Sequence, residues 1–306
     1  MQTIYADYKK VNSDAGTVVA IGNFDGVHKG HRCLLDTLKN VAKERGLPSV
    51  VYTFLKHPKN VILGDDAQKL LYPNEIKEKL IADTGVHTLF FEDFSQVREL
   101  SCEEFAEKIL KEKFNASAVV IGENGRFGKN SCGTAEKLKS LGELLGFDVF
   151  VVESVTAEGV VCSSSEIRKK IEAGDFKKAA ALLGRNYTVS GTVIEDKHLG
   201  RTYGYPTANL VPESNRARIL RGVYATNTIV GDKKYKSITN VGTTSFDDFE
   251  KERIETHILD FSENLYRQTI EVEFLYYMRD FKSFISTDEL KMQLDEDKKE
   301  RKLGGN

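Results

Sequence analysis

The stretch Thr17–His31, TVVAIGNFDGVHKGH, decides how this chain is organised, because an apolar run passes directly into a glycine-containing loop that ends in two histidines. The residues of Val18–Ile21 are small or branched and uninterrupted, which is typical of a parallel strand buried on both faces. After Gly30, leucines and a valine recur at helical spacing up to residue 46. This order predicts a central first strand, a tight loop and the start of a helix.

The two histidines, His28 and His31, lie three residues apart where this helix is expected to begin. Free N–H groups and the helix dipole attract phosphate at such a position. Both imidazoles can then face one triphosphate, while Gly22, Gly26 and Gly30 let the backbone approach it closely. From spacing alone, a tight turn with two solvated histidines is an equal alternative.

Length and composition set the broad class of the protein. The 306 residues suit two domains better than one, and a net charge of −2 with 29% charged residues does not suggest a polyanion-binding surface. We find no CxxC pair, no signal peptide and no apolar run of membrane-spanning length. We therefore expect a cytoplasmic protein with small-molecule partners, no nucleic-acid or membrane partner, and four free thiols: Cys33, Cys102, Cys132 and Cys162.

The first half alternates between strand and helix patterns without long gaps, which favours a doubly wound α/β sheet. We expect further strands at 48–54, 87–94, 116–122 and 147–155, and helices at 74–85, 101–114, 137–146 and 162–184. Ser101 and Glu104 have capping-box spacing at the start of one helix. His57 follows the second strand, so it either joins the ligand crevice at the strand ends or is a turn residue beside Pro58.

A serine run, Ser163–Ser165, opens the helix at 162–184, and Arg168 follows in its first turns. Hydroxyl groups, free N–H groups and a guanidinium make a phosphate clamp, although simple serine capping accounts equally well for the pattern. Glycine, asparagine and basic residues also gather in the loop 123–133, after another strand.

Beyond Gly184 the segments become short and alternating. Strands are expected at 187–195, 222–230, 233–241, 255–261 and 268–278, and a helix at 286–302 with Ser286 and Glu289 in capping-box spacing. This pattern predicts a small antiparallel barrel or sandwich closed by a C-terminal helix. We place the domains at 1–184 and 185–306.

Two further features in the second half point to phosphate chemistry. The loop 198–212, HLGRTYGYPTANLVP, has the glycines, arginine and polar side chains to wrap phosphates and hold Mg²⁺ through oxygens, or it is a turn with a weak anion site. Glu255 and His257 alternate on one strand, so both face the same side of the sheet. The carboxylate there takes a proton or forms a surface ion pair.

These residues carry a resemblance to a known family. Gly22–His31, GNFDGVHKGH, resembles the G-x-FDG-x-H-x-GH signature of bacterial FAD synthetases, which belong to the wider HxGH nucleotidyltransferases. Gly204–Asn209, Arg221–Tyr224 and Glu255–His257 are similar, in the same order, to motifs of riboflavin kinase. Together the halves resemble the bacterial bifunctional riboflavin kinase/FMN adenylyltransferases over nearly the whole chain.

The resemblance implies two reactions and two sets of residues. A Rossmann-like N-terminal domain would transfer AMP from ATP to FMN, and the C-terminal barrel would phosphorylate riboflavin. The implied catalytic residues are His28, His31, Arg168 and Glu255. The implied ATP or phosphate contacts are Gly22, Asn23, Phe24, Asp25, Gly30, Ser163, Ser164, Gly200, Arg201 and Tyr205. The flavin contacts are His57, Asn124, Arg126 and Phe127, and the magnesium ligands are Thr207 and Asn209.

The sequence also departs from the family pattern. Gly125 stands where an aromatic residue is usual, Ser165 stands where threonine is usual, and Glu166 adds a negative charge to the serine clamp. One alternative is therefore an enzyme with an active kinase and a weak adenylyltransferase. A second alternative is a flavin-sensing regulatory protein that binds its ligand without turnover.

Overall fold

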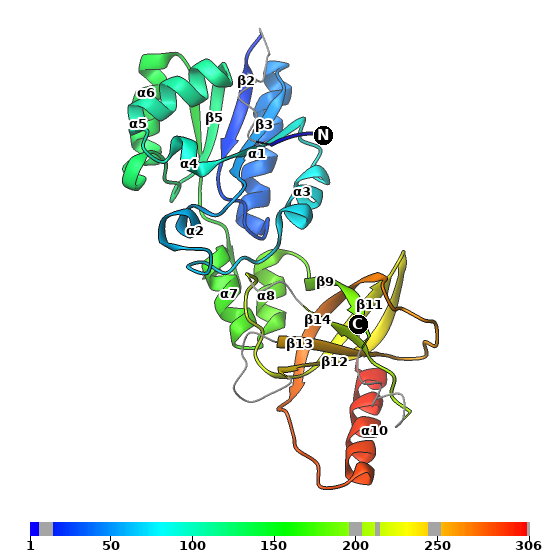
Figure 1. The fold of residues 1–306 in the computed structure, drawn as a ribbon. Helices are drawn as coiled ribbons and strands as arrows, with labels where there is room; N and C mark the ends of the chain where they lie inside the picture. The colour runs from blue at the N-terminus through cyan, green and yellow to red at the C-terminus, as the bar shows by residue number, and fades with distance from the viewer. Residues whose placement is uncertain (6–14, 196–203, 212–214, 244–251, 305–306) are drawn as a thin grey trace. The chain divides into compact units, whose positions relative to one another are not determined.

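The computed structural model describes residues 1–5, 15–195, 204–211, 215–243 and 252–304 (Figure 1). The chain divides into two compact units, Met1–Ser164 and Ser165–Asn306. Each unit is described by itself below.

The first unit is built on a six-stranded sheet in the order β1-β4-β3-β2-β5-β6. All neighbouring strands run parallel. The strands are β1 (Gln2–Tyr5), β2 (Thr17–Ile21), β3 (Ser49–Phe54), β4 (Thr88–Glu92), β5 (Ala116–Gly122) and β6 (Asp148–Val152). Every residue of β2 is buried between β3 and β5, which confirms the predicted central strand, but it is the second strand of the chain, because β1 precedes it at the edge of the sheet.

The strand order reverses at β2, because the chain continues to β3 and β4 on one side and later to β5 and β6 on the other. In open α/β sheets, ligands bind at the carboxyl ends of the strands beside such a switch point. The loops that follow β2 and β5 leave the sheet at this place. The topology therefore positions the glycine–histidine loop where a nucleotide site is expected.

Helices cover both faces of the sheet, as the alternating pattern predicted (Figure 1). Leu35 and Leu38 of α1 (Lys29–Arg45) and Ile81 of α3 (Asn74–Ala82) belong to the core on one face. Ile109 of η1 (Phe105–Lys113) and Leu138 of α6 (Ala135–Leu145) belong to the core on the other. Shorter helices are α2 (Pro58–Leu63), α4 (Phe94–Val97), α5 (Cys102–Glu104) and η2 (Lys129–Ser131).

Two predicted helices differ in detail from the observed ones. The capping box of Ser101 and Glu104 is confirmed, but the segment then continues as a π-helix, η1. The expected helix at 162–184 is two helices, α7 (Ser164–Glu172) and α8 (Phe176–Leu183). They separate at Gly174, whose φ of 72° is readily accessible only to glycine. A short hairpin of β7 (Thr156–Ala157) and β8 (Val160–Val161) precedes them.

The expectation of four free thiols is wrong for one pair. Cys102, at the start of α5, forms a disulfide with Cys132, at the end of the loop that follows β5. Cys33 and Cys162 are free. Spacing did not reveal this pair because 30 residues of chain separate the two cysteines and only the fold brings them together.

The second unit contains a closed antiparallel barrel in the order β10-β13-β12-β11-β14-β9. Its strands are β9 (Tyr187–Ile194), β10 (Ala208–Leu210), β11 (Gly222–Val230), β12 (Lys233–Thr243), β13 (Glu252–Ile258) and β14 (Thr269–Arg279). The barrel and its C-terminal helix α10 (Thr287–Leu303) confirm the predicted architecture. Strand β10 falls in a segment that we expected to be a loop, and it closes the barrel by pairing with both β9 and β13.

The barrel interior holds a cluster of hydroxyl groups that satisfy one another. Thr226, Thr228, Ser237, Thr239 and Thr256 are fully buried. The Thr226 hydroxyl lies 2.8 Å from that of Ser237 and 2.7 Å from that of Thr239, which in turn donates to Thr256 at 2.9 Å. Buried hydroxyls are tolerated here because each has a hydrogen-bond partner.

Helix α8 packs on the barrel through aromatic side chains. Phe176 is fully buried, and its ring centroid lies 4.8 Å from that of Phe274 and 5.3 Å from that of Tyr224. This packing groups 165–184 with the barrel in the compact units. The domain boundary at 184/185 remains a prediction about which activity these residues serve.

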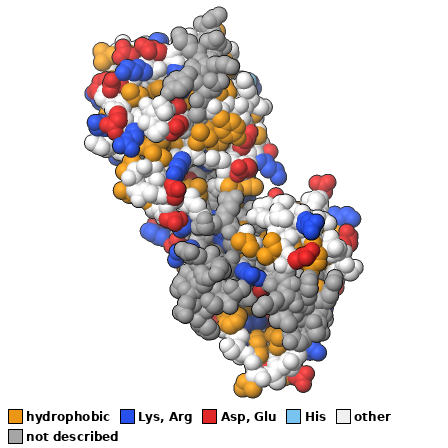
Figure 2. Space-filling model, viewed as in Figure 1, with side chains coloured by type: hydrophobic (Ala, Val, Ile, Leu, Met, Phe, Trp, Pro, Cys, Tyr) orange, Lys and Arg blue, Asp and Glu red, His pale blue; other side chains and the backbone are white. Residues whose placement is uncertain are grey.

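The charges on the surface are mixed in sign. On the face shown in Figure 2, basic and acidic side chains lie interspersed over both units. This matches the near balance of the whole chain, whose net charge is −2.

The contacts of α10 generate a prediction about the barrel. Arg301 is fully buried and donates to the backbone oxygens of Thr226, at 3.0 and 3.1 Å, and Ser237, at 3.3 Å. Arg301→Met leaves these carbonyls without a charged donor, so we expect the barrel to lose about 1.5–3 kcal/mol of unfolding free energy. Urea unfolding of the barrel measures the loss. Lys299→Met, at an exposed site on the same helix, is the matched control, and equal stability of the two variants would contradict the assignment.

Candidate active sites

The loop between β2 and α1 has an unusual backbone. Phe24 and Val27 have positive φ angles of 50° and 39°, and Gly26 has one of 83°. Both non-glycine side chains are fully buried, so packing holds the loop in this conformation. Residues in such sparsely populated regions cluster at functional sites, where the surrounding structure over-determines them.

His28 and His31 come together at the start of α1, as the sequence predicted. His28 caps the helix, and its Nδ1 accepts the backbone N–H of His31 at 3.3 Å. The two rings stack with centroids 3.7 Å apart. His28 is only 6% exposed, which excludes the reading of two solvated turn histidines. The paired imidazoles and the helix terminus form one cationic or hydrogen-bonding surface for an anion.

Neighbouring groups leave little room for a side chain at two glycines of this loop. A Cβ on Gly30 would lie 3.1 Å from the His28 ring and 3.3 Å from the backbone oxygen of Cys162. A Cβ on Gly22 would lie 3.1 Å from the ring of Phe24. A side chain at either position would press on a group that shapes the loop.

The predicted serine clamp is joined to this loop at one point. Ser164 Oγ donates to the backbone oxygen of Asp25 at 2.8 Å, and Ser163 immediately precedes α7. Further along α7, the Arg168 guanidinium lies 3.4 Å from Ser165 Oγ. Glu166 is paired with Lys169 at 2.6 Å, and this contact holds the pKa of the Glu166 carboxyl below its usual value.

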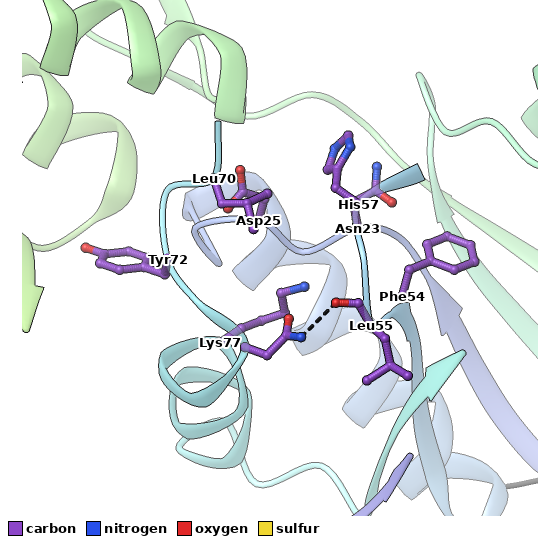
Figure 3. Close-up of a pocket in the computed structure, with 9 residues that line it drawn as sticks. Asn23, Asp25, Phe54, Leu55, His57, Leu70, Tyr72 and Lys77 are labelled. Atoms are coloured by element: carbon purple, nitrogen blue, oxygen red, sulfur yellow. Dashed lines mark hydrogen bonds between the residues drawn. The ribbon is translucent and has the colours of Figure 1, made fainter. Parts of the chain in front are cut away.

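A small pocket lies beside the loop, at the carboxyl ends of β2 and β3 (Figure 3). Asn23 and Asp25 line it together with His57, which caps α2 by accepting the N–H of Lys59 at 3.2 Å. The structure thus brings His57 to the predicted ATP residues. The remaining lining residues are Phe54, Leu55, Leu70, Tyr72, Asn74 and Lys77.

Lys77 is a residue that our reading of the sequence missed. It is 7% exposed on α3, and burial lowers its pKa from 10.5 to about 8, an effect that the Asp25 carboxylate partly opposes. The available signal was its spacing, because Lys77 lies four residues before the buried Ile81 and therefore on the apolar stripe of the helix.

The predicted flavin residues of the loop after β5 make local contacts. Asn124 donates to Ser154 Oγ at 3.0 Å, and Arg126 donates to the backbone oxygen of Gly125. Phe127 is buried, with its ring 5.6 Å from that of Phe105 in the core. These side chains do not line the pocket of Figure 3. A Cβ on Gly125 would lie 2.4 Å from Ile121 Cγ1, so the backbone here leaves no space for the aromatic residue usual in the family.

In the barrel, three polar side chains lie in a row across neighbouring strands. Glu255 of β13 is directly opposite Asn209 of β10 on one side and Asn240 of β12 on the other. The Oδ1 atoms of Asn209 and Asn240 are buried and have no hydrogen-bond partner within the described part of the chain. Two unsatisfied amide oxygens beside a carboxylate indicate a site built for a ligand. Asn240 was not predicted, because only the strand register places it beside Glu255.

The loop before β10 is held by β13 and α10. His257 Nδ1 lies 2.8 Å from the backbone oxygen of Pro206, and burial lowers the His257 pKa. The Tyr205 hydroxyl, predicted to contact phosphate, donates to Asp295 of α10 at 2.6 Å. Burial and this hydrogen bond raise the Tyr205 pKa to about 12. Gly200 and Arg201 lie outside the described residues.

The predicted magnesium ligands lie next to each other. Asn209 Nδ2 donates to Thr207 Oγ1 at 3.4 Å, and Asn209 Oδ1 is buried without a hydrogen-bond partner among the described residues. Amide, hydroxyl and carboxylate oxygens are the donors that Mg²⁺ takes, usually with water and substrate phosphates. Among the described residues, no group of three or more histidine, cysteine or acidic side chains is arranged for a metal.

Comparison with known proteins identifies a family for each half of the chain. Residues 10–166 match the model of the FAD synthetase family, and residues 183–303 match that of riboflavin kinase. The bifunctional riboflavin kinase/FMN adenylyltransferase of Escherichia coli K12 is 32% identical over 284 residues, 92% of this chain and 90% of that protein. The protein of the same name from Listeria monocytogenes is 32% identical over 98% of this chain and 97% of its own length.

A solved structure covers the whole chain. A Streptococcus pneumoniae protein named as a macrolide-efflux protein superposes with a TM-score of 0.91 at 32% identity, over 100% of both chains. In the parts of this chain that the structure describes, no helix is long and apolar enough to cross a membrane. The fold, the two matched domains and the full-length relatives lead to one conclusion: the chain is an enzyme of the bifunctional riboflavin kinase/FMN adenylyltransferase family.

Proposed function

We propose that this enzyme makes FMN and FAD at two separate sets of residues. The barrel phosphorylates riboflavin with ATP, and the parallel-sheet unit transfers AMP from ATP to FMN and releases pyrophosphate. The observation that carries the proposal is the stacking of His28 on His31 at the first turn of α1, in a unit that contains none of the barrel residues.

In the adenylyl transfer, the FMN phosphate attacks the α-phosphorus of ATP. Negative charge then builds on the α-phosphoryl oxygens and on the leaving pyrophosphate. His28, His31 and the N-terminus of α1 are positioned to stabilise that charge, with Ser164 and Arg168 as the proposed clamp. Because the nucleophile is already an anion, positioning and charge stabilisation account for catalysis without a general base.

In the kinase reaction, a ribityl hydroxyl attacks the γ-phosphate and must lose its proton. Glu255 is the proposed base, and Asn209 and Asn240 on either side are placed to orient the hydroxyl or the ATP. When bound by Thr207 and Asn209, Mg²⁺ would neutralise phosphate charge. A magnesium requirement and a cytoplasmic location, where ATP is available, are parts of this proposal.

The first prediction concerns His28 and His31. We expect His28→Ala and His31→Ala each to lower FAD formation a hundredfold or more, because each lost contact to transition-state charge costs about 2.7–4 kcal/mol. Riboflavin phosphorylation should stay nearly unchanged. The measurement is separate assay of FAD and FMN formation from purified protein.

His87→Ala is the matched control, since His87 is an exposed histidine just before β4, at the amino ends of the parallel strands, where its Nδ1 accepts the backbone N–H of Ser49. It should keep both activities. Equal loss of FAD and FMN formation in a folded His28 or His31 variant would exclude two separate sites.

The second prediction concerns Glu255. Glu255→Gln keeps the size of the side chain but removes the basic carboxylate, so riboflavin phosphorylation should fall about a hundredfold or more while substrates still bind. A surface ion pair would be worth only about 0–1 kcal/mol of stability and would leave turnover unchanged. Kinase turnover at saturating riboflavin and ATP decides between the two.

Glu271→Gln on β14 is the control for a carboxylate replaced elsewhere in the barrel, and FMN adenylylation is assayed alongside. A Glu255→Gln enzyme that phosphorylates riboflavin at the rate of the parent would remove Glu255 as the base. His257, on the same side of β13, would then be tested next.

A further inference from the structure

The buried lysine of α3 is not accounted for by either reaction as described so far. Lys77 lines the pocket of Figure 3, and its ammonium is directed into the space between α3 and the segment carrying Asn23 and Asp25. It has no hydrogen bond or ion pair with any residue that the structure describes. Its ammonium lies 5.6 Å from the centroid of the Phe91 ring. An ammonium buried in this way is costly unless something across the pocket compensates its charge.

The compensating charge is that of Asp25. This carboxylate is 3% exposed and lines the same pocket, and within the described part of the chain its charge raises the Lys77 pKa against the effect of burial. The pocket has room for about one water molecule, and its polar walls suit a water that bridges the two charges. The ammonium of Lys77 and the carboxylate of Asp25 thus line one small polar cavity and carry opposite charges.

Asp25 in turn holds the phosphate loop. Its Oδ1 accepts the backbone N–H of Leu71 at 2.9 Å, and its backbone oxygen accepts Ser164 Oγ at 2.8 Å. Asp25 precedes His28 by three residues in a loop with strained backbone angles. A change in the charge balance at Asp25 is therefore transmitted to the two imidazoles.

We propose that Lys77 is a positioning residue for adenylyl transfer: its ammonium, across the pocket from the buried Asp25 carboxylate, holds that side chain in place and thereby fixes the loop that presents His28 and His31. This inference rests on the proposed function of that loop. It assigns Lys77 no contact with substrate.

The charge state of Lys77 gives the proposal a pH signature. Burial places the Lys77 pKa near 8, so above about pH 8 the ammonium is lost and FAD formation should fall. Between pH 8 and the 10.5 of a free lysine, the unfolded chain binds more protons than the folded one, so stability should rise with pH over the same range. The titration of Lys77 therefore does not itself destabilise the fold in this range, and unfolding measured at the same pH values checks the total stability.

The pH dependence caused by Lys77 must be distinguished from that of the other titratable groups near it. Across the pocket they are Asp25, His57 and Tyr72, and on α3 itself they are Glu75, Glu78 and Lys79. Glu78 is already hydrogen-bonded to Thr3 and Tyr5. Variants of Lys77 that change its titration but leave these groups in place isolate its contribution.

The experiment compares Lys77→Met and Lys77→Arg with Lys79→Met, which changes an exposed lysine two residues away. FAD formation is measured from pH 6.5 to 9.5, with kcat and with KM for ATP and for FMN. We expect Lys77→Met to lower kcat by up to about a hundredfold below pH 8, with little change in either KM, and to approach the parent above pH 8, where the parent loses its ammonium. Lys77→Arg should keep its activity above pH 8, and Lys79→Met should match the parent.

Two outcomes of the kinetics would overturn the proposal. A Lys77→Met enzyme with a raised KM for ATP or FMN and an unchanged kcat would make Lys77 a substrate contact, and the affected substrate would identify which. Parent kinetics in Lys77→Met would leave the lysine without a role. In a double-mutant cycle with Asp25→Asn, we expect the combined variant to lose no more than the worse single variant, whereas fully additive losses would show that Lys77 does not act through Asp25.

A readout without turnover separates this inference from the proposed function. In NMR spectra, Lys77→Met should shift the imidazole resonances of His28 and His31, and Lys79→Met should leave them in place. Unshifted resonances in folded Lys77→Met would overturn the positioning role. A parent protein that makes no FAD would instead overturn the proposed function, and the imidazole shifts would still decide the role of Lys77.

Discussion

The buried carboxylate of Asp25 is the group on which the nucleotide unit depends. A charge almost wholly removed from water must be compensated, and Asp25 meets this need by taking the N–H of Leu71 and facing the ammonium of Lys77. Its backbone oxygen also receives the hydroxyl of Ser164. The side chain of Asp25 thus joins the loop after β2 to the segment before α3, and its backbone oxygen joins the same loop to Ser164 at the start of α7. The strained conformation of the loop, with positive φ angles at Phe24 and Val27, is held by this set of contacts together with the packing of both side chains.

Buried polar groups of the barrel also need partners, and the two faces of its strands differ in whether the protein supplies them. Inside, the hydroxyls of residues such as Thr226 and Thr239 pair with one another, so the interior is polar but satisfied. On the other face of the same strands, Glu255 lies between Asn209 and Asn240, whose amide oxygens are buried without a partner among the described residues. Since native proteins leave few buried polar atoms unsatisfied, the row across β10, β13 and β12 is the candidate ligand site of the barrel. Both sets of polar groups are buried, so what distinguishes the candidate site is that its amide oxygens lack hydrogen-bond partners among the described residues.

The parts of the fold that follow from local sequence could be predicted, and the parts that depend on distant pairing could not. The strand, loop and helix from Thr17 to Arg45 are encoded by adjacent residues, and the structure has them as expected, with His28 and His31 together. Strand β10 was missed because its three residues are extended only through pairing with β9 and β13. Asn240 was missed for the same reason, since it meets Glu255 through strand register alone. The break between α7 and α8 falls at Gly174. This glycine was visible in the sequence, but a glycine within a helical pattern does not always end a helix.

Under the proposed function, the two sites have different sets of side chains because their nucleophiles differ in protonation state. The phosphate of FMN is an anion at neutral pH, so the first site has no proton to remove and needs groups that collect negative charge. It accordingly has a helix N-terminus with the imidazoles of His28 and His31. The ribityl hydroxyl is neutral and a poor nucleophile until its proton is taken, so the barrel requires a carboxylate, and Glu255 lies beside amide oxygens that can hold the hydroxyl. An uncompensated ammonium near the first site would attract substrate phosphate in competition with the histidines. Asp25 lines the same pocket as Lys77, and under our proposal its carboxylate compensates the lysine charge, so that the ammonium supports the loop and does not bind phosphate.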